Sequence, residues 1–84
     1  MSMRILYFAW LKNKTGKSKE YINNSKIKDT KSLLRFLSKK YPKLEEFTKK
    51  RNLIRISVNL NYITKNKKLK KNDEIAIFPP VSGG

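Results

Sequence analysis

The fold is decided by two uninterrupted apolar runs, ILYFAWL at residues 5–11 and IAIF at residues 75–78. Each run is short for a helix and rich in aromatic or β-branched residues, a composition that favours strands. A strand without polar alternation is typical of one that is covered on both faces or that is buried at the centre of a sheet. We therefore expect the two runs to form central strands that lie side by side and parallel, joined by a right-handed crossover.

The segments between the two runs supply the flanking strands. Residues 12–17 are expected to form a turn, after which residues 19–22 return as an antiparallel edge strand. Strict alternation predicts a middle strand over residues 54–60, and its asparagines favour a tight turn into a very short strand at residues 62–63. The inward positions of the middle strand are Ile54, Ile56, Val58 and Leu60.

One amphipathic helix is predicted between the hairpin and the middle strand. Asp29 offers an N-cap, and Pro42 disfavours helical geometry at the residue before it, which ends the helix. One arc carries Leu33, Leu34, Phe36, Leu37 and Tyr41, and the opposite arc carries Lys31, Arg35, Ser38 and Lys39. Leu44 and Phe47 suggest a further short helical turn, and Leu69 is expected to be a single buried residue in a polar loop.

This order of hairpin, helix and strands is that of an α+β fold, the β-grasp or ubiquitin-like roll, with a mixed sheet packed against one main helix. A chain of 84 residues has room for one such domain. We predict a β-grasp domain over residues 1–78 and an extended C-terminal Gly-Gly tail over residues 79–84.

The amino-acid composition limits the classes of partner and of site that we expect. The net charge of +15, from 21 basic and 6 acidic residues, raises nucleic acid as a partner, but lysine far outnumbers the arginine that base and phosphate recognition favours. Nucleic acid is therefore an unlikely partner, although the charge should steer encounters with acidic proteins and with phosphate-bearing small molecules. Without cysteine or histidine we expect no disulfide and no metal site, and without a long apolar run we expect a cytoplasmic protein with no membrane span.

The tail sets the functional prediction. Two prolines at Pro79 and Pro80 stiffen the exit from the last strand, and Gly83 and Gly84 are slim enough to thread a narrow slot. From Pro80 to the terminus the extended chain spans roughly 15 to 17 Å. The terminal carboxylate is the expected reactive group, and another protein must activate it, because this chain has no phosphate-binding loop and no Cys or His for catalysis.

Residues 72–84, NDEIAIFPPVSGG, resemble the C-terminus of the molybdopterin synthase small-subunit family, which are ubiquitin-like sulfur carriers. The resemblance extends over nearly the whole chain, with support at residues 6–9, 58–59 and 62–63. Ser82 stands where the family often has Thr, a change that keeps the hydroxyl.

The resemblance implies a role in molybdenum cofactor biosynthesis. A partner adenylating (E1-like) enzyme would use ATP to activate Gly84, and a sulfur donor would convert it to a thiocarboxylate. Val81, Ser82 and Gly83 would insert into the large subunit of the synthase, where the sulfur reaches a pterin precursor. The chain would be the sulfur-donating subunit of a sulfurtransferase complex, neither an enzyme on its own nor the permanent holder of a cofactor. The implied partner interface comprises Phe8, Phe78, Pro79 and Pro80, with Val81 beside them.

Three alternatives remain open at the level of sequence. Phe8 and Phe78 could both be ordinary core residues; this explains Phe8 as well as an interface does, whereas Phe78 is better explained as an interface residue because it stands where the strand gives way to the tail. A sulfur carrier for thiamine synthesis or for tRNA thiolation would also end in Gly-Gly, although the FPPV lead-in favours molybdopterin. A small basic nucleic-acid-binding domain, stacking bases on Tyr7, Trp10 or Tyr62, would leave the tail unexplained.

Overall fold

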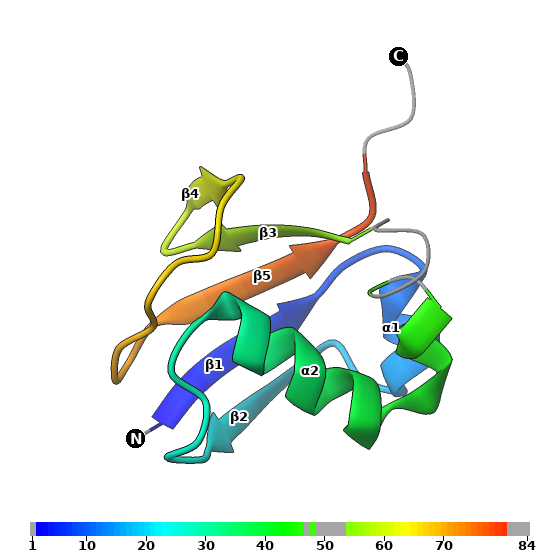
Figure 1. Ribbon diagram of the computed structural model, residues 1–84. Coiled ribbons are helices and arrows are strands. Elements are labelled where there is room, and N and C mark those ends of the chain that lie inside the picture. The colour runs from blue at the N-terminus through cyan, green and yellow to red at the C-terminus, as the bar shows by residue number, and fades with distance from the viewer. Residues whose placement is uncertain (1, 47, 49–53, 81–84) are drawn as a thin grey trace.

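The computed structural model describes residues 2–46, 48 and 54–80. A mixed five-stranded sheet in the order β2-β1-β5-β3-β4 packs against one main helix (Figure 1), which confirms the α+β, β-grasp prediction. The strands are β1 (Ser2–Tyr7), β2 (Lys19–Asn23), β3 (Arg55–Val58), β4 (Asn61–Ile63) and β5 (Glu74–Phe78). The helices are α1 (Leu11–Thr15), α2 (Thr30–Lys40) and a single 3₁₀ turn, η1 (Pro42–Leu44).

The two apolar runs supply the central strands, as predicted. β1 and β5 are parallel neighbours, with a register that runs from Arg4 opposite Glu74 to Tyr7 opposite Ile77. β2 is the antiparallel edge strand beside β1, and β3 is antiparallel to both β5 and β4. Helix α2 follows β2 and precedes β3 in the sequence, and it packs across one face of the sheet. It therefore forms the crossover connection of the β-grasp.

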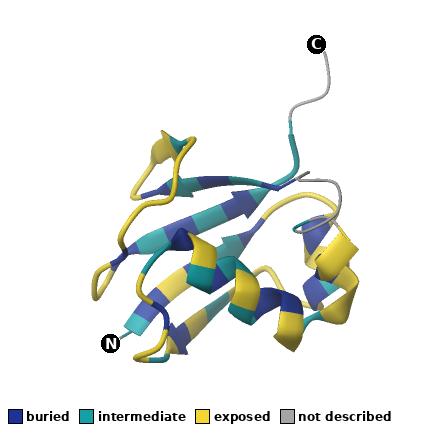
Figure 2. Cartoon of the chain, in the orientation of Figure 1, coloured by how far each residue is buried: buried dark blue, intermediate teal, exposed yellow. Residues whose placement is uncertain are grey.

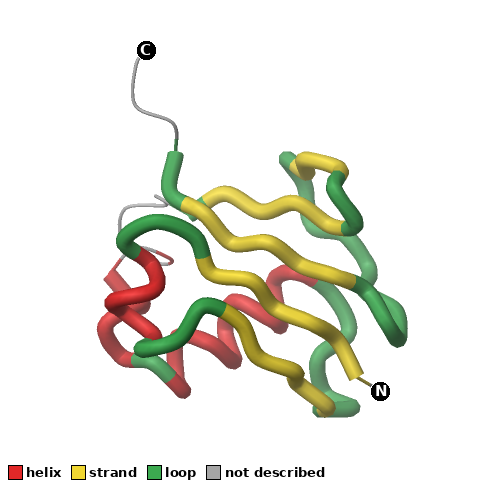
Figure 3. The backbone as a smooth tube through the Cα atoms, turned by 180° about the vertical axis from the view of Figure 1, so that it is seen from behind, coloured by secondary structure: helices red, strands yellow, loops and turns green. Residues whose placement is uncertain are grey.

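Of the two alternatives for the apolar runs, a place at the centre of the sheet is confirmed and cover on both faces is wrong. Inward residues of β1 and β5, such as Ile5 and Ile77, are fully buried, whereas their neighbours Leu6 and Ala76 are only half-buried. The alternation of burial along the strands is visible in Figure 2. Seen from behind, the strands have no helix of the described chain over them (Figure 3), because the single main helix covers one face only. The apolar content of the runs therefore exceeds what the core uses.

The first run also ends earlier than predicted. β1 stops at Tyr7, and Ala9 adopts a positive φ of 54° that turns the chain away from the sheet. Helix α1 then replaces the turn expected over residues 12–17, because Leu11 and Thr15, one helical turn apart, both face the core. Gly16 closes this helix in the left-handed conformation, with φ of 80° and its N–H donated to the Lys12 carbonyl at 2.7 Å.

Helix α2 begins and ends where the sequence predicts. The Asp29 carboxylate accepts a hydrogen bond from the Ser32 N–H at 2.8 Å, and the Ser32 hydroxyl in turn accepts from the Asp29 N–H at 3.0 Å, which is a reciprocal capping box. Leu33 and Leu37 are buried. Ser38 was placed on the polar arc, but it is buried and shares a 2.6 Å hydrogen bond with Thr48.

The C-terminal end of α2 is fastened to the edge strand by one carboxylate. Glu20 on β2 accepts hydrogen bonds from the Tyr7 hydroxyl at 2.6 Å, the Tyr41 hydroxyl at 2.5 Å and the Lys40 ammonium at 2.8 Å. Burial alone would raise the pKa of Glu20, but these donors outweigh it and the pKa is lowered. Burial and the adjacent carboxylate raise the pKa of both tyrosines. An ionised Glu20 thus joins three elements of the fold.

Leu60 was predicted to face inward, and it does not. β3 ends at Val58, which pairs with Asn61, so Asn59 and Leu60 form a two-residue hairpin turn with φ of 51° and 70°. Leu60 is 87% exposed. Leu69 is buried, as predicted, and Leu44 is buried in the short helical turn η1. Phe47 lies outside the described residues.

Candidate functional site

An apolar hollow lies on the open face of the sheet, at the point where β5 leads into the tail. It has a volume of about 530 Å³. Its lining residues come from the end of β1, from β3, from the β3–β4 turn and from the end of β5, and they are Phe8, Ala9, Ser57, Leu60, Ala76, Phe78, Pro79 and Pro80. We refer to these eight residues as the tail-base patch.

Phe8 belongs to this patch and not to the core. Its N–H donates to the Ile77 carbonyl at 3.0 Å, which extends the β1–β5 pairing by one residue, and the positive φ of Ala9 then turns the chain. The side chain of Phe8 is 45% exposed. The core alternative for Phe8 is therefore wrong, and the surface position implied by the resemblance holds.

Leu60 is presented to the patch by a strained turn. A non-glycine residue with φ near 70° is uncommon, and a two-residue hairpin turn of this type normally carries glycine at the second position. The turn is anchored through Asn59, whose side chain accepts from the Glu74 N–H at 2.9 Å and donates to the Asp73 carboxylate at 2.9 Å. The Leu60 side chain is therefore held exposed to solvent at the edge of the hollow.

Phe78 stands between the sheet and the tail. It is half-buried, lies opposite Arg55 in the β3–β5 register, and has its ring centroid 6.2 Å from that of Tyr62 on β4. Tyr62 is itself 57% exposed. Pro79 and Pro80 follow Phe78 and are half-buried along the rim of the hollow. The structure thus brings together all four residues of the expected interface, Phe8, Phe78, Pro79 and Pro80.

The remaining site residues of the sequence prediction, Val81, Ser82, Gly83 and Gly84, lie outside the described residues. Across residues 2–46, 48 and 54–80, no group of His, Cys, Asp or Glu side chains could hold a metal ion. In the same part of the chain, no helix is long and apolar enough to cross a bilayer.

Sequence reasoning missed part of the patch. Ser57 and Ala76 sit opposite each other in the β3–β5 register and form its floor, but small residues in strands give no signal of exposure. The prediction that Leu60 faces the core was wrong because it extended the apolar–polar alternation of the strand past Asn59. The asparagine was the available signal, since it tolerates positive φ and marks the end of a strand.

The chain matches the model of the ThiS family over residues 5–84. It is 39% identical to the molybdopterin synthase sulfur carrier subunit of Dictyostelium discoideum over 84 residues, which cover 96% of this chain and 94% of that protein. The two sequences therefore correspond over almost their whole length.

Solved structures agree with this match. The crystal structure of SAMP1 from Haloferax volcanii is 26% identical and superimposes with a TM-score of 0.82, covering 100% of both chains. A chain from the complex of subunits 1 and 2 of the molybdopterin-converting factor of Helicobacter pylori is 27% identical, with a TM-score of 0.69 and 100% of both chains covered. The chain belongs to the ThiS family, among the molybdopterin synthase sulfur carrier subunits.

Proposed function

We propose that this sulfur carrier works through the carboxylate of Gly84 and docks on its partners through the tail-base patch. The observation that carries the proposal is the apolar hollow at the exit of β5, with Phe8 and Leu60 held in solvent around it. An exposed apolar patch on a small domain marks an interaction surface. Its place beside the tail means that a partner bound there receives the terminal carboxylate.

The proposed cycle needs two kinds of partner. On an adenylating enzyme, the Gly84 carboxylate attacks the α-phosphorus of ATP. Pyrophosphate leaves, and Gly84 becomes an acyl-adenylate. A donor of sulfide-level sulfur then attacks the acyl carbon and displaces AMP, which leaves a thiocarboxylate on Gly84. In the large subunit of the synthase the thiocarboxylate sulfur attacks a carbon of the pterin precursor and displaces an oxygen substituent from it. Water then cleaves the acyl–sulfur bond, which leaves the sulfur on the pterin and returns Gly84 to a carboxylate. This chain supplies the sulfur and its delivery, and the partner proteins supply the catalytic groups.

The existence of a large-subunit partner is supported by the Helicobacter pylori structure, which is a complex of two subunits. The division into a domain over residues 1–78 and a tail over residues 79–84 stays a prediction, and it agrees with the end of β5 at Phe78.

The test is to extend the chain by one alanine after Gly84. Purified wild type and the extended variant are each incubated with an adenylating enzyme, ATP and a sulfur donor, and their intact masses are measured. We expect wild type to gain the mass difference of one oxygen exchanged for sulfur and the extended variant to gain none, with unchanged melting temperatures. Sulfur incorporation by the extended variant would contradict the role of Gly84.

A further inference from the structure

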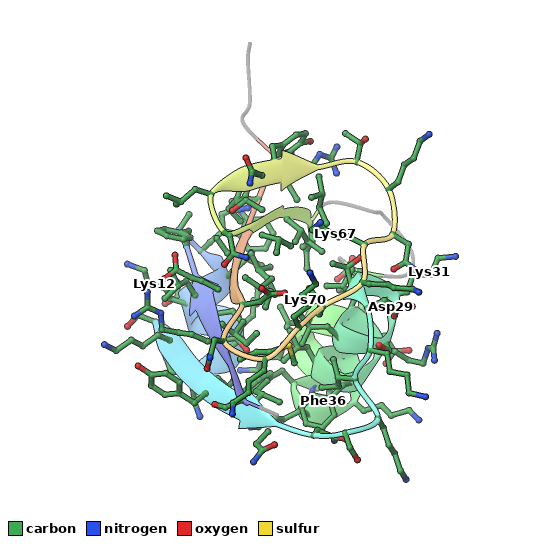
Figure 4. The ribbon with its side chains drawn as sticks, turned by 90° about the vertical axis from the view of Figure 1, so that its left-hand side faces the viewer. Lys12, Asp29, Lys31, Phe36, Lys67 and Lys70 are labelled. Carbon is green, nitrogen blue, oxygen red and sulfur yellow. The ribbon has the colours of Figure 1, made fainter. Side chains whose placement is uncertain are left out.

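A second surface gathers lysines from two stretches that are distant in sequence. We refer to it as the lysine face. All of its members are exposed, and they are Lys26, Lys28, Lys31, Lys65, Lys67, Lys68, Lys70 and Lys71. Three of these, Lys31, Lys67 and Lys70, are marked in Figure 4, around Asp29.

Backbone hydrogen bonds hold the two stretches side by side. The Thr30 N–H donates to the Lys67 carbonyl at 2.9 Å, and the Leu69 N–H donates to the Lys28 carbonyl at 2.9 Å. The side-chain oxygen of Asn66 accepts from the Thr30 hydroxyl at 3.0 Å and from the Lys31 N–H at 2.9 Å. The lysines therefore project from a cross-linked pair of segments and not from two independent loops.

Asp29 lies within the first stretch and Asp73 follows the second, and both carboxylates accept hydrogen bonds from neutral groups of the fold. Asp29 accepts from the Ser32 N–H and from the Asn66 side chain, and Asp73 is buried and accepts from Asn59 and from the Lys70 N–H at 2.7 Å. Among the described residues, no carboxylate lies within ion-pair distance of any of the eight lysine ammonium groups. The eight ammonium groups thus form no direct ion pair within the described chain, and the negative charge of Asp29 offsets only a part of their positive charge.

A groove of about 460 Å³ opens beside the lysine face, between α2 and the β3–β4 hairpin. Its apolar lining includes Leu34, Ile56 and Ile63, and its cationic lining is Lys31, Arg55 and Lys65. No Asp or Glu of the described chain lines it. Lys31 and Lys65 belong to both the groove and the lysine face, so the two features are continuous.

We propose that the groove and the lysine face together bind an acidic, extended segment of a partner protein, with an aliphatic side chain in the groove and carboxylates over the lysines. Charge complementarity requires an anionic partner, and the apolar lining requires a partner with side chains to bury. A nucleic acid fits less well, because Arg55 is the one arginine of the described site against eight lysines, and Tyr62 is the one aromatic residue among the described residues that line the groove.

The lysine face is separate from the tail. Residues 65–71 lead into the start of β5, whereas the tail leaves from its end, so the two lie at opposite ends of that strand (Figure 1). The groove reaches closer to the tail-base patch, because its lining residues Arg55 and Tyr62 are neighbours of Phe78. The inference does not depend on the sulfur chemistry of Gly84, and either can fail without the other.

The experiment measures binding of three fluorescent probes to the full chain at several salt concentrations. The probes are a glutamate-rich peptide containing leucines, the same peptide with serine in place of leucine, and an RNA oligonucleotide of equal charge. The test variant carries Lys26→Gln, Lys28→Gln, Lys67→Gln and Lys68→Gln. The matched control carries Lys12→Gln, Lys19→Gln, Lys39→Gln and Lys43→Gln, four exposed lysines outside the lysine face, and therefore has the same net charge.

We expect the test variant to bind the leucine-containing peptide about tenfold more weakly than wild type and the control to lose less than about threefold. The serine peptide should bind wild type more weakly than the leucine peptide. Equal losses in the two variants would mean that net charge alone drives binding, and would overturn the proposal. Tighter binding of RNA than of the leucine peptide would overturn it in favour of a nucleic-acid partner.

Discussion

Leu60 combines two unfavourable properties in one residue, since it has a positive φ and an aliphatic side chain that is 87% exposed. Neither property helps the isolated domain fold. Backbone strain of this kind persists where the surroundings impose it and is concentrated at functional sites. Leu60 is therefore the residue at which stability and partner binding are expected to oppose each other.

Replacing Leu60 with glycine tests this opposition. Glycine is relaxed at this φ and completes the Asn-Gly sequence favoured in such turns, so the free energy of unfolding should rise by roughly 1 kcal/mol. The affinity for the large subunit should fall, because the side chain leaves the tail-base patch. Denaturant unfolding and calorimetric titration measure the two effects. A variant that gains stability and keeps full affinity would remove Leu60 from the interface.

Phe8 and Ile77 are joined by a backbone hydrogen bond but differ in burial, and this makes them a matched pair. Phe8→Ala should weaken binding to the large subunit while changing the free energy of unfolding by less than about 1 kcal/mol. Ile77→Ala removes a fully buried side chain and should cost about 2–5 kcal/mol of stability. A large stability loss in Phe8→Ala with unchanged affinity would return Phe8 to the core.

At the scale of elements, helix α2 is bound to the rest of the fold at both ends. Its start is capped by Asp29, which also accepts a hydrogen bond from Asn66 in the 65–71 segment, and its end is joined to β2 through Glu20. The hydrogen bond from Asn66, followed by those from Ser32, lowers the pKa of Asp29 to about 2. Both ends thus depend on an ionised carboxylate.

The Asp29 cap predicts a pH dependence. Because the folded pKa of about 2 lies below the usual 3.8, ionised Asp29 stabilises the fold above about pH 4, and this contribution is lost as the pH falls towards 2. Asp29→Asn keeps a capping oxygen but cannot ionise, so its stability should fall less than that of wild type between pH 5 and pH 2. Unfolding by denaturant at a series of pH values measures this difference. Parallel pH profiles for the two proteins would show that the cap does not depend on charge.

At the scale of the whole molecule, the two faces of the sheet have different roles. The face under α2 builds the core, and the open face carries the tail-base patch at the end from which the tail leaves. A small domain with a single main helix has no second layer to cover the open face. The apolar residues there are consequently exposed, and the fold itself explains why the proposed docking surface lies on this face.

The paired glycines of the tail give a prediction about the assembled complex. If Gly83 passes through a slot shaped for bare backbone, then Gly83→Leu should block sulfur transfer in the large subunit, while the stability of the free domain changes by less than about 0.5 kcal/mol. Both proteins are supplied as chemically prepared thiocarboxylates, so that activation is bypassed, and sulfur transfer to the pterin precursor is measured. Comparable transfer rates would mean that the passage is not narrow.

The sequence by itself determined the strand order around one helix, the bounds of α2 and the family. It could do so because apolar runs, the Asp29 cap, Pro42 and the FPPVSGG terminus are local signals that do not depend on neighbours. The parallel pairing of β1 and β5 also followed, since two apolar strands joined through a helix have few other arrangements.

Only the tertiary structure decided which apolar residues are core and which are surface. Phe8 and Leu6 have the same composition signal as Ile5, and what separates them is the side of the sheet on which the single helix packs. The Glu20 network and the pairing of the two lysine-rich stretches could not be predicted from the sequence because, unlike the two apolar runs, these segments carry no pattern that identifies the segment they meet. Long-range contacts of this kind form only when the whole chain has folded, and no local pattern encodes them.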